Sequence, residues 1–205
     1  MSEKTQKTNS QIPNEKIKKT IDLILQSPEC ISLIKKKYIT DDILEYCLLE
    51  DSTIFKHIPH PSMRIISVAL EIDGANLKHV KKKTRKALPV EYFIKAINSN
   101  PEEALPYVPK KYIPEEIKVE ILDTHPELIK ENKIKIAQDD FLKDKIKVNP
   151  QYIKFITDPS EDLKCIALES DPNIALYFDK LTPRMMDIID EKYPTLKEVL
   201  PNYNR

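Results

Sequence analysis

The chain has 205 residues and no net charge, because 33 Lys and Arg balance 33 Asp and Glu. Such a balance is a poor indication of a general nucleic-acid or membrane binder. With 40% hydrophobic residues the chain has enough apolar surface for a packed core, which argues against wholesale disorder. One glycine nearly excludes hairpin-rich β folds and every glycine-rich phosphate loop, and sixteen prolines must lie at helix starts or between helices.

The N-terminus is polar and lacks the apolar stretch of a secretory signal. We therefore expect a disordered tail over residues 1–11 and a single helical-repeat domain over residues 12–205. No apolar run approaches the roughly 18 residues of a membrane span. The cysteines, Cys30, Cys47 and Cys165, are odd in number, far apart in sequence and on apolar faces. They predict free thiols in a reducing, cytoplasmic setting.

A short phrase recurs along the chain at intervals of 22 to 27 residues. Each copy has a capping residue or proline, an acidic residue, an apolar stretch, a dipeptide such as Asn-Pro or Asp-Pro, and a second apolar stretch. The dipeptides that mark the copies are Ser27-Pro28, Asp51-Ser52, Asp73-Gly74, Asn100-Pro101, His125-Pro126, Asn149-Pro150, Asp171-Pro172 and Tyr193-Pro194. Periods of this length indicate stacked helical units and not a single globular core.

Each copy predicts a pair of helices. Apolar residues at spacings of three and four, such as Ile65, Val68 and Ala69, form one face of the first helix. The Asn or Asp of the dipeptide is expected to cap a second, shorter helix, because the residue before proline is pushed out of the helical region. Eight copies fit, so the sequence predicts an all-α fold, an α-solenoid of about eight stacked short helix pairs.

Two features predict details of helix starts and loops. Asp158 is expected to cap a helix that begins at Pro159, and Thr182 is expected to cap one that begins at Pro183. The fourth junction, over residues 78–88, is the longest because it contains a run of basic residues. We expect a longer loop or an extended helix there.

Residues 149–168 read Asn-Pro-Gln-Tyr-Ile-Lys-Phe-Ile-Thr-Asp-Pro-Ser-Glu-Asp-Leu-Lys-Cys-Ile-Ala-Leu. This stretch resembles the short helical repeats of an uncharacterised domain found in giant-virus, phage and bacterial proteins. The resemblance is good over residues 150–179, fair over 59–80 and weak over 101–145. It implies an architecture and no catalytic residues. The richness in Lys, Ile, Asn and Asp resembles that of proteins from AT-rich genomes, which suits a virus or phage. A cytoplasmic protein of viral origin would lie in the host cytoplasm or in the virion.

No residue pattern predicts a catalytic, cofactor or metal site. His57 and His60 form a His-x-x-His pair, but a metal needs further ligands, and Pro59 interrupts the helix that would align the two rings. His125 stands where other copies have Asn or Asp, which indicates a cap or a turn. Adjacent carboxylates lie mostly in first helical turns, where the helix dipole accounts for them. We therefore expect no enzyme and no cofactor.

Charge is distributed unevenly along the chain. Residues 1–111 contain 19 Lys and Arg against 14 Asp and Glu, whereas residues 112–205 contain 14 against 19. Three basic runs fall at the predicted ends of second helices, and regular stacking would align them along one edge. We call their members the basic edge: Lys35, Lys36, Lys37, Lys81, Lys82, Lys83, Arg85, Lys86, Lys110 and Lys111. Such an edge suits phosphates or an acidic protein, although lysines at helix C-termini also complement the helix dipole.

These patterns leave two binding functions open. We expect a non-enzymatic scaffold that binds another protein through one face of the stack, engaging host machinery or a viral assembly. The alternative is a nucleic-acid-binding solenoid that uses the basic edge. A basic first half and an acidic second half also suit head-to-tail self-association, and no membrane partner is expected.

Overall fold

The computed structural model describes residues 15–201 and 203, so the tail expected over residues 1–11 lies outside the described residues. Throughout the described chain the regular structure is helical and contains no strand, which confirms the all-α prediction. The chain divides into two compact units, unit 1 (Met1–Tyr107) and unit 2 (Val108–Arg205). One continuous repeat domain over residues 12–205 stays a prediction.

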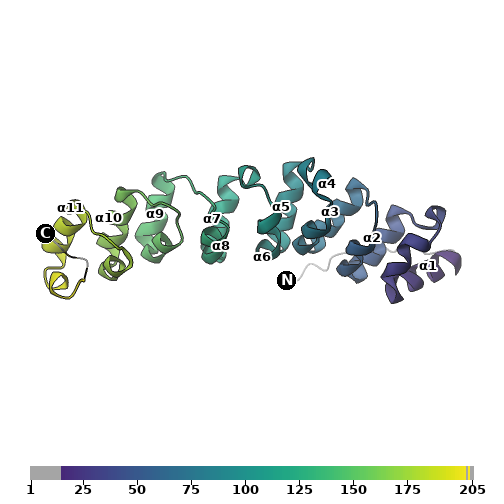
Figure 1. The fold of residues 1–205 in the computed structure, drawn as a ribbon, viewed down its shortest axis with the longest axis horizontal. Coiled ribbons are helices and arrows are strands. Elements are labelled where there is room, and N and C mark those ends of the chain that lie inside the picture. The colour runs from purple at the N-terminus through teal and green to yellow at the C-terminus, as the bar shows by residue number, and fades with distance from the viewer. Residues whose placement is uncertain (1–14, 202, 204–205) are drawn as a thin grey trace, which may run out of the picture. The chain divides into compact units, whose positions relative to one another are not determined.

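Figure 1 shows the helices and labels the α-helices; in the text α denotes an α-helix and η a 3-10 helix. Unit 1 contains α1 (Glu15–Gln26), η1 (Pro28–Leu33), η2 (Lys36–Tyr38), α2 (Asp41–Glu50), η3 (Ser52–His57), α3 (Met63–Ile72), η4 (Gly74–His79), α4 (Lys82–Lys86), α5 (Val90–Ser99), α6 (Pro101–Ala104) and η5 (Leu105–Tyr107). Unit 2 contains η6 (Lys110–Tyr112), α7 (Glu115–Thr124), α8 (Pro126–Glu131), α9 (Asp140–Val148), η7 (Pro150–Lys154), α10 (Glu161–Ser170), η8 (Pro172–Tyr177), α11 (Pro183–Lys192) and η9 (Leu196–Glu198).

Within the described residues the helices form eight pairs, each with a longer first helix and a shorter second helix. The first helices are α1, α2, α3, α5, α7, α9, α10 and α11. The second helices follow directly and are η1, η3, η4, α6 with η5, α8, η7, η8 and η9. Most second helices are 3-10 helices, a form that suits segments of one or two turns. We call the segment between a second helix and the next first helix a connector.

In the pairs whose two helices are separated by an Asn or Asp, that residue caps the second helix, as the sequence predicts. Asp73 Oδ1 accepts a hydrogen bond from the Ala75 amide at 2.9 Å. Asp51 and Asp171 make the same bond to the amide two residues further on. Asn100 caps α6 through the amide three residues on. These bonds satisfy amides that the first turn of a helix leaves without a partner.

His125 is an exception to this capping pattern. It occupies the cap position before α8, but its side chain makes no capping hydrogen bond there. Its Nδ1 atom instead lies 3.7 Å from Glu127 Oε1. Pro126 at the first helical position has no N–H, so the first turn of α8 has one amide fewer without an intrahelical partner. His125 therefore takes the predicted turn position without acting as a side-chain cap.

Most first helices also begin at a side-chain cap, and one predicted start is wrong. Thr182 caps α11, with proline at the first helical position, as the sequence predicts. Ahead of α10 the cap is Ser160, whose Oγ accepts from the Leu163 amide at 3.4 Å, and not Asp158. Asp158 has φ 52°, a left-handed conformation that Asp tolerates better than most residues. Asp158 and Pro159 therefore turn the chain before the helix begins.

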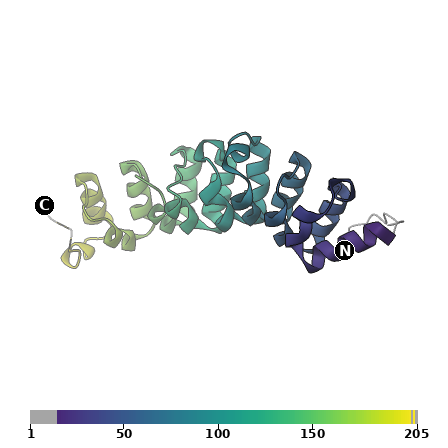
Figure 2. The same ribbon diagram turned by 45° about the vertical axis from the view of Figure 1, so that its right-hand side comes forward.

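In unit 1 the first helices pack in one row and the second helices in another. α2 contacts α1 and α3, and α3 contacts α5. η3 contacts η1 and η4, and η4 contacts α6. The row of second helices and the row of first helices lie on opposite sides of the unit (Figure 1 and Figure 2). Fully buried side chains between the rows include Leu48, Ile54, Ile65, Leu70, Leu77 and Phe93. Because helices of this length are marginal in water, this burial stabilises them.

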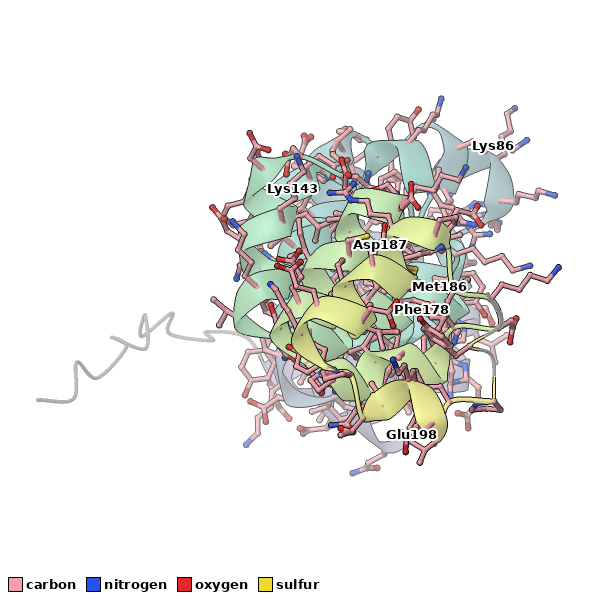
Figure 3. The ribbon with its side chains drawn as sticks, turned by 90° about the vertical axis from the view of Figure 1, so that its left-hand side faces the viewer. Lys86, Lys143, Phe178, Met186, Asp187 and Glu198 are labelled. Atoms are coloured by element: carbon pink, nitrogen blue, oxygen red, sulfur yellow. The ribbon has the colours of Figure 1, made fainter. Side chains whose placement is uncertain are left out.

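In unit 2, α10 contacts α9 and α11 along the chain, and η7 contacts α10 and η8. One core cluster consists of Cys165, Leu168, Ala175, Leu181, Met185, Ile188, Ile189 and Leu200. Phe178 and Met186 pack against this cluster and are seen near each other in Figure 3. α7 is linked to the segment before α9 by a hydrogen bond from the Ala137 amide to Glu115 Oε2 at 3.0 Å.

Gly74 is the single glycine of the chain, and a close backbone approach requires it. Its φ is not positive, so turn geometry does not account for it. A Cβ built on Gly74 would lie 2.0 Å from the carbonyl oxygen of Ala96 and 2.8 Å from its carbonyl carbon. Because these are backbone atoms of α5, they cannot swing aside as a side chain can. The start of η4 is therefore in backbone contact with the next first helix.

We expect Gly74→Ala to destabilise the chain by about 2 kcal/mol, since overpacking of a tight contact costs about 1–3 kcal/mol. Chemical and thermal unfolding of the full chain measure the change. Ser52→Ala, at the equivalent first position of η3, is the matched control and should stay within about 0.5 kcal/mol of the wild type. Equal unfolding midpoints for the two variants would contradict the backbone contact.

The three cysteines are free thiols, as the sequence predicts, and they differ in burial. Cys30 is half-buried, whereas Cys47 and Cys165 are buried. Burial, with a smaller contribution from Glu50, raises the pKa of Cys47 to about 11. Burial also raises the pKa of Cys165. Both buried thiols therefore stay protonated at neutral pH, whereas the thiolate is the reactive form.

We expect a thiol-alkylating reagent at neutral pH to modify Cys30 about tenfold faster than Cys47 or Cys165, because only Cys30 is partly accessible. Mass spectrometry of peptides from partially labelled native protein measures the three rates. Under denaturing conditions the three rates should converge, which controls for local sequence. Labelling of native Cys47 as fast as Cys30 would show that its site opens.

Candidate functional site

The basic edge is built from connectors. The run at 35–37 leads into η2 and forms most of it, the run at 81–86 leads into α4, and the run at 110–111 begins η6. Each run lies beyond a second helix and not at its C-terminus as predicted, because an extended residue ends the helix first, for example Ile34 or Val80. The expected longer loop or extended helix at the fourth junction is the separate short helix α4.

The structure places two of the three basic runs in the same unit. The runs at 35–37 and 81–86 belong to unit 1, and the run at 110–111 belongs to unit 2. Between the first two runs the chain forms the connector at 58–62, which borders residues 79–84 across a shared cavity. The alignment of all three runs along one edge stays a prediction.

The lysines of the basic edge are exposed and make no ion pair within residues 15–201 and 203. Lys86, for example, extends away from the ribbon (Figure 3). Several cations of the first helices behave differently, because they pair with carboxylates of the preceding first helix. Arg64 lies 2.9 Å from Asp42, and Lys95 lies 2.7 Å from Glu71. The same link joins α9 to α7 and α11 to α10. The connectors therefore keep positive charge available to a ligand.

Arg85 is the structural member of the basic edge. It is half-buried, and its Nη1 donates to the Leu77 carbonyl at 3.2 Å. Its guanidinium lies 5.1 Å from the ring centre of Tyr107. Arg85 therefore ties α4 to the last turn of η4 and to η5, which leaves the lysines as the ligand-binding candidates of the edge.

Two basic runs contain the same sequence, Lys-Lys-Tyr, in the same 3-10 conformation. Lys37 Nζ lies 4.9 Å from the ring centre of Tyr38, and Lys111 Nζ lies 4.6 Å from that of Tyr112. A cation over an aromatic face at this distance is attracted to it, which holds the two side chains side by side. Sites for single-stranded nucleic acid combine such cations with aromatic surfaces.

A cavity of about 150 Å³ lies between two connectors of unit 1. Its lining residues are Ile58, Pro59, His60, Pro61, Ile66, His79, Val80, Lys81 and Thr84. His60 and His79 both line it, although they belong to successive helix pairs. The sequence pattern pairs His60 with His57 and leaves His79 without a partner, so this juxtaposition was missed. We call this hollow the histidine cavity.

A signal for the histidine cavity was present in the sequence. Lys56-His57 and Lys78-His79 end η3 and η4 at equivalent positions, so Lys-His recurs in successive copies. In the structure these residues create a positive environment. Burial lowers the pKa of His79, and Lys78, Lys56 and His57 lower it further. The His79 ring is therefore uncharged at neutral pH, although lysines surround it.

A second hollow, of about 350 Å³, lies in unit 2 beside α7, α9 and η7. Its lining residues are Asp123, Phe141, Asp144, Lys145, Val148, Asn149 and Tyr152. Phe141 is 56% exposed and Val148 is 87% exposed. Lys145 forms an ion pair with Asp123, and its Nζ lies 5.6 Å from the ring centre of Phe141. We call this hollow the α9 groove.

At the α9 groove the chain differs from the next copy of its repeat. The second residue of the first helix is Phe141 in α9 but Asp162 in α10. The ninth residue is Val148 in α9 but Glu169 in α10. Exposed apolar side chains at places where a neighbouring copy has carboxylates contribute little to the core of the fold. Such local exceptions are expected where a surface binds something.

The described part of the chain also bears on metal and membrane sites. It contains no group of three or more His, Cys, Asp or Glu side chains placed to hold a metal ion. None of its helices has both the length and the apolar character needed to cross a membrane.

The chain matches no protein-family model, and comparisons with curated proteins and with solved structures found no match. The resemblance of residues 149–168 to repeats of viral, phage and bacterial proteins therefore stays a prediction. The function of the chain has to be inferred from the side chains of its own structure.

We expect protonation of His79 to lower the stability of the chain on the acid side. Its folded-state pKa lies below the ordinary value of 6.5, so the unfolded state takes up the proton more readily. The stabilisation by the neutral ring is present above pH 6.5 and is lost as the pH falls toward the lowered pKa. The melting temperature of His79→Gln should therefore fall less than that of the wild type between about pH 7.5 and about pH 5.

Lys56→Gln is the companion variant, because it keeps the His79 ring and removes one charge that lowers its pKa. The fall in its melting temperature over the same pH range should be intermediate between that of the wild type and that of His79→Gln. Thermal unfolding of the three proteins over the same pH series measures the effect. Equal losses for the wild type and His79→Gln would show that His79 does not contribute.

Proposed function

We propose that this chain is a non-enzymatic helical-repeat scaffold, an α-solenoid of about eight stacked helix pairs, that binds another protein. The α9 groove carries the proposal, because it combines a hollow with two large apolar side chains that the fold leaves exposed. Its volume of about 350 Å³ accommodates one or two side chains of a partner. Exposed Phe141 is the kind of aromatic residue that dominates protein interfaces.

The charge around the α9 groove indicates the chemistry of the partner. Residues 112–205 contain 14 Lys and Arg against 19 Asp and Glu. Asp144 lines the groove and its side chain is 71% exposed, and its ion pair with Lys147 at the surface is easily exchanged. A partner segment with one large apolar side chain and an adjacent Lys or Arg therefore fits this groove.

The setting and alternative partners follow from the same features. Three free thiols support a reducing, cytoplasmic compartment, and a viral or phage origin would place the partner in the host or in a virion. A second copy of this chain is also a candidate partner, because the basic first half and the acidic second half attract each other head to tail.

A second candidate function, nucleic-acid binding through the basic edge, is favoured by a separate observation. The lysines of the connectors have no ion pair within the described chain, whereas several cations of the first helices do. Phosphates would neutralise these lysines, and the affinity would then fall steeply with salt.

Affinity capture with the tagged full chain, with and without nuclease, tests the leading proposal. We expect a partner protein that resists nuclease and whose binding is weakened about tenfold or more by the double variant Phe141→Asp, Val148→Asp, because a buried aromatic anchor supplies a large share of an interface. Val199→Asp is the matched control, since Val199 is an exposed apolar residue of the same unit outside the groove.

The outcomes separate the two candidate functions. A partner that the double variant retains would overturn the role of the α9 groove. Recovery of nucleic acid alone, or of proteins that nuclease releases, would replace the leading proposal by the second candidate. If light scattering shows that the protein forms an oligomer that dissociates at high salt, a second copy of the chain is the partner.

A further inference from the structure

The histidine cavity is a small, partly open site that the repeat does not require. Its floor is apolar and buried, formed by Ile58, Ile66 and Val80. Its volume of about 150 Å³ is below that of pockets for drug-sized ligands, which hold roughly 300–1,000 Å³. The cavity therefore suits a single planar ring.

The polar groups at the histidine cavity select the charge of what enters. The polar residues that line it are His60, His79, Lys81 and Thr84, and no lining residue is acidic. Imidazole rings stack on planar heterocycles, and an ammonium group pairs with phosphate. A ring that carries or adjoins a negative charge is the ligand that this combination recognises.

The surroundings of the cavity extend its positive charge. Lys82, Lys83 and Lys86 belong to α4, which begins directly after Lys81, and they are exposed without an ion pair in the described chain. The charges that lower the pKa of His79 are all positive, and no carboxylate contributes to that shift. The neutral imidazole is available for stacking, while the lysines on α4 provide several positions for phosphates.

We propose that unit 1 binds single-stranded nucleic acid, with one base in the histidine cavity against His60 and His79 and the adjoining phosphates on Lys81, Lys82 and Lys83. This inference rests on the second candidate function and names its ligand class and its contact site. It does not depend on the α9 groove, which belongs to unit 2.

Single strands fit the site better than duplexes or acidic peptides. The bases of a duplex are stacked and paired within it, so none can enter a cavity without being extruded at a cost. Unstacked bases of a single strand are free to splay onto protein side chains. An acidic peptide would satisfy the lysines but would leave the apolar floor and the two rings unused.

Fluorescence anisotropy with the full chain tests the inference at low salt. The probes are a single strand of about 12 nucleotides, an abasic strand of the same length, and the corresponding duplex. We expect the single strand to bind at least about fivefold more tightly than the abasic strand, because stacking of one base contributes a factor of roughly 5 to 150. Deoxythymidine and uridine strands distinguish DNA from RNA as the natural source.

Two sets of variants separate the cavity from the lysines. His60→Ala with His79→Ala should weaken the single strand to the level of the abasic strand and leave the salt dependence unchanged. Lys82→Gln with Lys83→Gln should weaken both strands and reduce the slope of log affinity against log salt by about 1.4, at about 0.7 per phosphate contact. His125→Ala, in unit 2, is the control for loss of a histidine. Proton NMR of the histidine rings during titration reports base contact directly and confirms that each variant is folded.

The possible results are distinguishable. Tighter binding of the single strand than of the abasic strand, lost in the double histidine variant, establishes the base site. Equal binding of single strand, abasic strand and duplex would overturn the base site and keep the basic edge as a general phosphate surface. Absence of binding to every probe at low salt would overturn both the inference and the second candidate function, and would leave the protein-binding proposal untouched.

Discussion

Seven of the eight helix pairs in the described chain depend on the one residue that joins their two helices. In the third pair this residue is Asp73, whose amide donates to the Ala69 carbonyl of α3 at 3.0 Å while its Oδ1 accepts from the Ala75 amide of η4 at 2.9 Å. One extended residue therefore ends one helix and begins the next. Asn100, at the same place in the following pair, donates to Asp73 Oδ1 at 3.0 Å. The junctions thus link neighbouring pairs as well as neighbouring helices.

The packing of the rows follows from these short junctions. Because each second helix begins at once, it is held close to its own first helix and to the next pair, as Gly74 shows against Ala96. The first helices then lie near enough for ion pairs between successive pairs, such as Lys95 with Glu71. Each connector begins at the C-terminal end of a second helix, opposite the junction with its first helix. The basic-edge lysines on the connectors make no such ion pairs among the residues that the structure describes. The division between neutralised and available cations is therefore a consequence of the geometry of the pair.

The two proposed sites lie where copies depart from the common pattern. α9 carries Phe141 and Val148 where α10 carries carboxylates, and the third and fourth pairs are separated by the inserted helix α4. Departures of this kind are informative in a repeat protein, because neighbouring copies show what packing alone requires. One site belongs to each unit, so a protein partner and a nucleic acid would not compete for the same residues.

Local chemistry was sufficient to predict the helix pairs, their register and most of their caps. Asp73 and Thr182 act within three residues of themselves, and apolar spacing reports a helical face without knowledge of its neighbours. The start of α10 was assigned wrongly because Asp158 and Ser160 are both good caps, and the left-handed turn at Asp158 decides between them.

Tertiary packing alone decided the sites. His60 meets His79 at one cavity only because two pairs pack side by side, and the exposure of Phe141 depends on which helices adjoin α9. Whether a lysine is neutralised likewise depends on the carboxylate that the preceding pair presents, as Glu71 does for Lys95. A sequence records the order of these side chains, but ion pairing and enclosure act over distances in space, which are settled only when the pairs are packed together.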